Sequence, residues 1–109
     1  EVSFTTPADD ETDVPTEEEP LLAFSEPMDP ATVTLAAISV VNQDNGSEFD
    51  MGNVSEVRDS DNSAFIITHR TGNSFDPNTP YEITINTSVR DAGGTPLADP
   101  HVFRFTTAQ

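Results

Sequence analysis

Short apolar runs with a period of two, separated by turn residues, limit what this sequence can fold into. Apolar and polar residues alternate in Tyr-Glu-Ile-Thr-Ile from Tyr81 and in Phe-Arg-Phe from Phe103. Such alternation is typical of a β-strand with one buried face. No stretch keeps apolar residues at helical spacing for three turns, and nine prolines interrupt the chain. The sequence therefore predicts an all-β fold.

Seven runs of this kind occur along the 109 residues, with Gly, Pro, Asn, Asp or Ser between them. They cover residues 2–6, 20–25, 37–42, 52–58, 64–69, 81–87 and 101–107. The Asn45-Gly46 step between two of them suits the positive φ of a hairpin turn. This pattern predicts an Ig-like antiparallel β-sandwich of about seven strands. The length is that of one domain, so we expect residues 1–109 to form a single Ig-like domain.

The charge balance is strongly acidic, with 20 acidic residues, four arginines, no lysine and a net charge of −16. A surface of this sign repels phosphate backbones and anionic lipids, so we expect no nucleic-acid partner. It also repels itself unless cations screen it. The absence of cysteine excludes disulfides and thiolate metal sites. No apolar run reaches membrane-spanning length, and we expect no membrane insertion.

Five blocks, taken in order, resemble the bacterial Ig-like domains of S-layer proteins and large surface adhesins. They are residues 14–15, 24–29 (Phe-Ser-Glu-Pro-Met-Asp), 80–84 (Pro-Tyr-Glu-Ile-Thr), 89–97 and 105–107. The similarity runs from about Thr6 to Thr107, and residues 24–29 are its most specific part. Two departures are Thr95, where such domains often have Asn, and His69, where proline is common. They affect loop detail and leave the expected architecture unchanged.

The resemblance implies a non-catalytic spacer or structural module of a large extracellular or cell-surface protein, in which such domains stand in tandem. The chain starts and ends in the middle of the pattern, so we expect a module excised from a longer multidomain protein. Its partners would be neighbouring domains of the same polypeptide, and the isolated domain would be a monomer. Two alternatives stay open: a module that binds a polysaccharide or protein receptor, and an accessory domain of a secreted hydrolase.

If the strands alternate in direction, their connections collect at two ends of the sandwich. We call the end where residue 1 lies the near pole, and it receives connections 25–36, 59–63 and 88–100. The other end is the far pole. The near pole would gather five candidate ligand residues, Glu26, Asp29, Asp59, Asp61 and Asp91. Carboxylates from several loops are the hard oxygen ligands that Ca²⁺ takes, so calcium is the expected cation there.

Two readings of these acids remain open, one or more calcium sites assembled across loops or a diffuse, solvated acidic surface. No EF-hand loop is present, because position six counted from Asp59 is Ala64 and position twelve is Arg70. Catalysis is not expected, since a general acid needs a carboxyl kept neutral by burial and an exposed rim loop does not bury one. The two histidines, His69 and His101, are interpreted as polar residues at strand edges.

Three structural roles are also expected. Met28 should fill the core beneath its loop. The Tyr81 hydroxyl should bond a loop backbone group, as in a tyrosine corner. The phenylalanines should be core residues rather than an exposed aromatic row.

Overall fold

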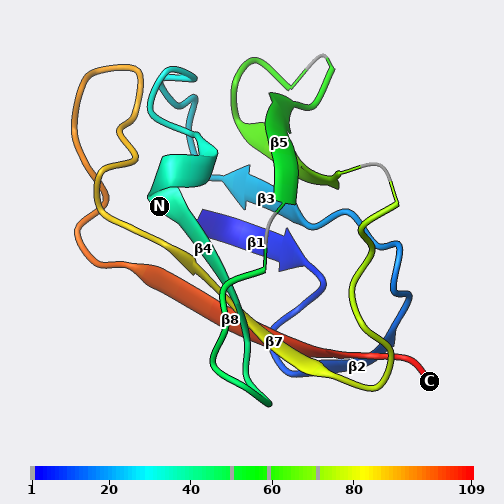
Figure 1. Cartoon of the computed structure of the whole chain (residues 1–109). Coiled ribbons are helices and arrows are strands. Elements are labelled where there is room, and N and C mark those ends of the chain that lie inside the picture. The colour runs from blue at the N-terminus through cyan, green and yellow to red at the C-terminus, as the bar shows by residue number, and fades with distance from the viewer. Residues whose placement is uncertain (1, 50, 59, 71) are drawn as a thin grey trace.

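The computed structural model describes residues 2–49, 51–58, 60–70 and 72–109. Within these ranges eight strands form two sheets of four, packed as a sandwich (Figure 1). The strands are β1 (Val2–Thr6), β2 (Glu11–Val14), β3 (Leu21–Phe24), β4 (Ile38–Asn42), β5 (Met51–Glu56), β6 (Ala64–His69), β7 (Pro80–Ile85) and β8 (His101–Thr107). A short 3-10 helix, η1 (Leu35–Ala37), precedes β4. The predicted all-β, Ig-like sandwich is confirmed.

One sheet has the strand order β1-β3-β6-β5 and the other β2-β8-β7-β4. All pairs are antiparallel except β2 with β8. The period-two pattern appears as alternating burial in β4 and β7, which gives each of these strands one inward face. Tyr81, Ile83 and Ile85 of β7 are fully buried, and Leu22 and Ile67 meet them from the other sheet. Burying each such side chain stabilises the fold by about 1.5–3 kcal/mol.

Strand β2 lies between the predicted runs 2–6 and 20–25, in a segment that the sequence pattern predicted to be a connection. For Glu11–Val14 that prediction is wrong. Only Val14 of this strand is buried. An edge strand needs backbone pairing more than apolar side chains, and this one pairs in parallel with β8. Its acidic sequence carries no alternation, so the strand has no signal in the pattern. The backbone crosses between the sheets here, held by a hydrogen bond from the Asp10 amide to the Arg104 carbonyl, 2.7 Å.

The far pole holds a cluster of five rings, which we call the aromatic cluster: Phe49, His69, Phe75, Tyr81 and Phe105. The Tyr81 hydroxyl accepts a hydrogen bond from the Asp76 amide at 2.9 Å, which confirms the predicted tyrosine corner. Burial raises the pKa of this hydroxyl, so it stays protonated. The cluster joins β7 and β8 to the connection before β7.

The two ends of the chain's path lie at opposite poles. Val2, in β1, lines a pocket at the near pole together with Met28 and Asp91. Thr107, at the end of β8, donates its hydroxyl to the Asp76 carbonyl at the far pole, 2.6 Å. The molecule measures 41 × 26 × 21 Å along its principal axes.

Candidate functional site at the near pole

Residues 24–29 form the base of the near pole. Phe24 and Met28 are buried, with 5% and 2% of their surface exposed. The Phe24 ring packs edge-on against Phe65, 6.0 Å between centroids. The predicted role of Met28 as a core residue is confirmed. Glu26 and Pro27 between them are exposed. The block is therefore fixed in the core by Phe24 and Met28, while its middle residues face the solvent.

Backbone hydrogen bonds tie this block to the two other connections at the near pole. The Met28 amide donates to the Asn62 carbonyl at 2.8 Å, and the Asp29 amide donates to the Arg90 carbonyl at 2.9 Å. The Ala92 amide donates to the Pro27 carbonyl at 3.0 Å. The three connections therefore meet, as the alternation of strands predicts, and the pole is one bonded surface.

The Asp29 carboxylate is used within its own turn. Its Oδ1 accepts from the Ala31 amide at 3.0 Å. Its main-chain carbonyl accepts from both the amide and the hydroxyl of Thr32, at 3.0 and 2.7 Å. This residue therefore shapes the corner between β3 and η1.

The Asp91 carboxylate organises the turn after β7. Its Oδ1 accepts from the amides of Gly93 and Thr95, both at 2.9 Å. Gly94, between them, has φ of 90°, a backbone region that glycine enters without strain. Hydrogen bonds hold the pKa of Asp91 below its usual range. In order of decreasing effect, they come from the Thr95 amide, Glu26 and the Gly93 amide. Asp91 is therefore ionised at neutral pH.

Of the five candidate ligands, Glu26 and Asp91 line the same pocket at the near pole. Asp61 is exposed in the turn before β6, with φ of 57°. Asp59 lies outside the described residues. In the described part of the chain, no three acidic or imidazole side chains converge where they could hold a metal ion.

A pocket of about 410 Å³ opens beside the Glu26 and Asp91 pair. Met28 and Leu97 supply apolar lining, and Asp99 and His101 line it as well. The pocket offers carboxylates and one imidazole to solvent. Because the pKa of Asp91 is lowered, this carboxylate is poorly suited to donate a proton as a general acid.

Ionised Asp91 should make stability depend on pH. Its pKa in the folded chain lies below the unfolded value of about 3.9, so its contribution to stability is complete above about pH 5 and is lost as pH falls toward the folded pKa. An Asp91→Asn variant should therefore lose less stability than the parent between pH 5 and 3. Urea unfolding midpoints between pH 5 and 3 measure this loss of stability, and Asp61→Asn, at an exposed position, is the control. Parallel curves for parent and Asp91→Asn would rule the contribution out.

His69 is a residue whose place the sequence reasoning missed. It was interpreted as a polar edge residue, but its ring packs against Phe75 with 4.4 Å between centroids. Its Nε2 lies 2.8 Å from the Glu18 carbonyl, while its buried Nδ1 has no hydrogen-bond partner among the described residues. The signal was present, since His69 continues the inward series of Phe65 and Ile67 by a step of two.

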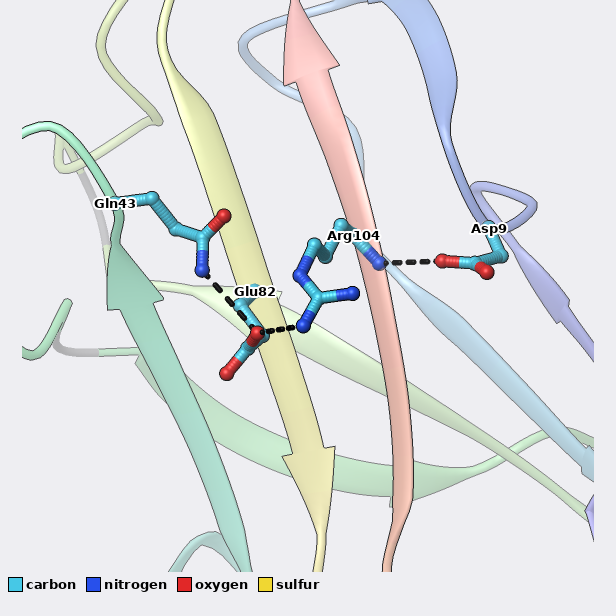
Figure 2. Close-up of polar contacts among 4 residues, drawn as sticks. All are labelled: Asp9, Gln43, Glu82 and Arg104. Atoms are coloured by element: carbon cyan, nitrogen blue, oxygen red, sulfur yellow. Dashed lines mark hydrogen bonds and ion pairs between the residues drawn. The ribbon is translucent and has the colours of Figure 1, made fainter.

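A polar row on the second sheet runs from Gln43, directly after β4, across β7 and β8 (Figure 2). Arg104 pairs with Glu82 at 2.8 Å, and the Gln43 amide donates to the same carboxylate at 3.2 Å. The Asp9 carboxylate accepts from the Arg104 main-chain amide at 3.0 Å (Figure 2). The Arg104 side chain is exposed and that of Glu82 is half-buried, so solvent screens the pair and it contributes about 1 kcal/mol or less to stability. The ion pair joins β8 and β7, the two central strands of this sheet.

No helix among the described residues is long and apolar enough to cross a membrane.

Comparison with solved structures finds the same sandwich in several proteins. The structure of surface layer protein SbsC, domains 1–6, superposes with a TM-score of 0.72 at 13% identity, and the alignment covers 98% of this chain and 13% of SbsC. CopC from Methylosinus trichosporium OB3b superposes with a TM-score of 0.73 at 12% identity, and the alignment covers 98% of this chain and 91% of CopC. PcoC, a copper resistance protein from Escherichia coli, superposes with a TM-score of 0.74 at 16% identity, and the alignment covers 98% of both chains.

Identities this low show a shared fold alone. This chain spans only a small part of the SbsC structure, 13% of its length. No curated protein sequence matches the chain. The sequence model described as a bacterial Ig-like domain matches residues 1–107, and the chain therefore belongs to the bacterial Ig-like domain family.

Proposed function

We propose that this domain is a non-catalytic spacer module of a large bacterial cell-surface protein, of the S-layer or adhesin type. The observation that carries the proposal is the path of the chain, with β1 beginning at one pole and β8 ending at the other along a body 41 Å long. Modules joined in this way would extend a polypeptide. The fold shared with a domain of SbsC, a surface layer protein, supports placement at the cell surface.

The spacer role is tested in the protein that carries the module. Deleting residues 1–109 should shorten the reach of that protein from the cell surface, measured by electron microscopy, by about one module length. Replacing the module with an unrelated Ig-like domain should restore the reach. A deletion that leaves both reach and adhesion unchanged would remove the spacer role, while loss of adhesion that no replacement restores would favour the ligand-binding alternative.

The copper resistance protein PcoC shares only the fold with this chain, at 16% identity, so the likeness carries no argument for copper here.

The acidic surface leads to a prediction about cations. With a net charge of −16, the folded chain repels itself, and screening should stabilise it. Because Asp29 and Asp91 already accept loop amides, we expect NaCl, MgCl₂ and CaCl₂ to raise the melting temperature equally at matched ionic strength. Thermal unfolding followed by circular dichroism measures this.

Calcium binding at the near pole is the competing proposal, and the pocket lined by Glu26, Asp91 and Asp99 supports it. A site of this kind, at tenfold ligand excess, would add about 1.4 kcal/mol beyond screening. Such a site would raise the melting temperature with CaCl₂ but not with the other two salts, beyond the rise due to screening. The extra rise should be smaller in Asp91→Asn and unchanged in the control Asp44→Asn at the far pole. That result would contradict simple screening.

A further inference from the structure

Three peptide bonds in this chain join aspartate to proline: Asp29-Pro30, Asp76-Pro77 and Asp99-Pro100. Such bonds break in mild acid without an enzyme. A carboxylate oxygen of the aspartate attacks its own main-chain carbonyl carbon and forms a five-membered anhydride. The bond to the proline nitrogen breaks, and this basic nitrogen leaves with a proton from the medium. Water then opens the anhydride, so the net reaction is hydrolysis of one peptide bond.

We propose that the folded chain cleaves itself in mild acid at the Asp99-Pro100 bond and spares the other two. All three sites share the same dipeptide chemistry, so any difference among them in the folded state comes from tertiary structure. The reaction needs the side chain to turn onto its own carbonyl and the peptide to lose its planarity. A site held by hydrogen bonds on both sides resists these movements.

The Asp29-Pro30 bond is held on both sides. The Asp29 Oδ1 is bonded to the Ala31 amide, away from the carbonyl that it would attack. The Asp29 carbonyl accepts two bonds from Thr32, and the Pro30 carbonyl accepts from the Val33 amide at 3.3 Å. The Asp29 amide is also bonded to Arg90 across the pole.

The Asp76-Pro77 bond is held by the far pole. The Asp76 carbonyl accepts the Thr107 hydroxyl at 2.6 Å, and the Asp76 amide donates to the Tyr81 hydroxyl. The Pro77 carbonyl accepts the Thr79 hydroxyl at 2.8 Å. Thr107 and Tyr81 are both buried, so these bonds fix the segment to the core.

The Asp99-Pro100 bond has no such restraint. Both residues are exposed, and no described residue makes a hydrogen bond to either of them. Asp99 lines the near-pole pocket with Glu26, Asp91 and His101, the titratable groups that face this segment. Because the bond is exposed, the departing proline nitrogen can take its proton directly from the acidic medium.

Freedom of the segment also decides whether a break becomes permanent. An amine held beside the anhydride re-forms the peptide bond, because reacting groups fixed together have effective concentrations of about 10⁵ M or more. Asp29 and Asp76 would hold the two new ends in place. At Asp99 the exposed segment can move away before water opens the anhydride. The cut would leave β8 in place only through its pairing with β7 and β2.

The test follows the intact chain at about pH 4, near the usual pKa of aspartate, under salt conditions in which circular dichroism shows it folded. Mass spectrometry after denaturation should find fragments 1–99 and 100–109 appearing at least about tenfold faster than fragments cut after Asp29 or Asp76. In concentrated urea at the same pH, the three bonds should break at similar rates.

Variants complete the test. Asp99→Asn should abolish the folded-state cut, and Asp76→Asn, the matched control, should leave it unchanged. Equal rates at the three bonds in the folded chain would overturn the proposal. So would a first cut after Asp29 or Asp76, or a folded chain that stays intact while the urea-unfolded chain is cleaved.

Discussion

A Phe75→Ala variant is expected to have a free energy of unfolding about 3–5 kcal/mol lower than the parent chain. Phe75 is 2% exposed and lies at the centre of the aromatic cluster, with ring centroids 4.6 Å from Tyr81 and 5.2 Å from Phe105. Truncation removes these contacts and leaves a cavity between the strands and the connection before β7. Domains of this size have total stabilities of about 5–15 kcal/mol, so the variant should lose much of its margin.

Urea unfolding at equilibrium measures this loss, and Val102→Ala is the matched control. Val102 lies on β8 with 39% of its surface exposed, so its truncation should change stability by no more than about 0.5 kcal/mol. A loss below 1 kcal/mol for Phe75→Ala would mean that the aromatic cluster does not stabilise the far pole.

A Met28→Ala variant is expected to lose about 2–5 kcal/mol and to loosen the near pole. Met28 is 2% exposed, and its amide is bonded to the Asn62 carbonyl, so its side chain supports the connections that meet there. Hydrogen exchange should therefore speed up at the amides of Asp29 and Ala92, which bond across the pole. Amides of β7 should keep their protection relative to global unfolding.

Leu35→Ala is the control for this prediction, since Leu35 is also a large apolar residue of the near-pole connection but is 36% exposed. We expect it to change stability by less than about 1 kcal/mol. If both variants lost the same stability, burial of Met28 would not be what holds the pole together.

Much of the fold could be predicted because its signal is local. Period-two alternation located seven of the eight strands, since each has an inward face that must be apolar. Alternation of strand direction then placed three connections at one pole, and the hydrogen bonds from Met28 to Asn62 and from Asp29 to Arg90 bear this out. Tyr81 could be placed as well, because its hydroxyl needs a partner wherever the ring is buried.

Two features were missed for physical reasons. Strand β2 is held by backbone pairing with β8 at an edge, which leaves its acidic side chains without a pattern. His69 was assigned by residue type, although its position two residues after Ile67 placed it inward. Whether a histidine can point inward depends on the groups that contact its ring. For His69 these are the Phe75 ring and the Glu18 carbonyl.

The sequence alone determined the sandwich, the family resemblance and the strong negative charge, because all three depend on composition and local spacing. Only the tertiary structure decided which acids meet. It placed Glu26 and Asp91 in the lining of one pocket, used the Asp29 carboxylate within its own turn, and left Asp99 free of hydrogen bonds from described residues. These outcomes depend on loop paths, and loop paths are set by long-range backbone bonds such as that between Ala92 and Pro27. No local pattern encodes bonds between residues so far apart in the chain.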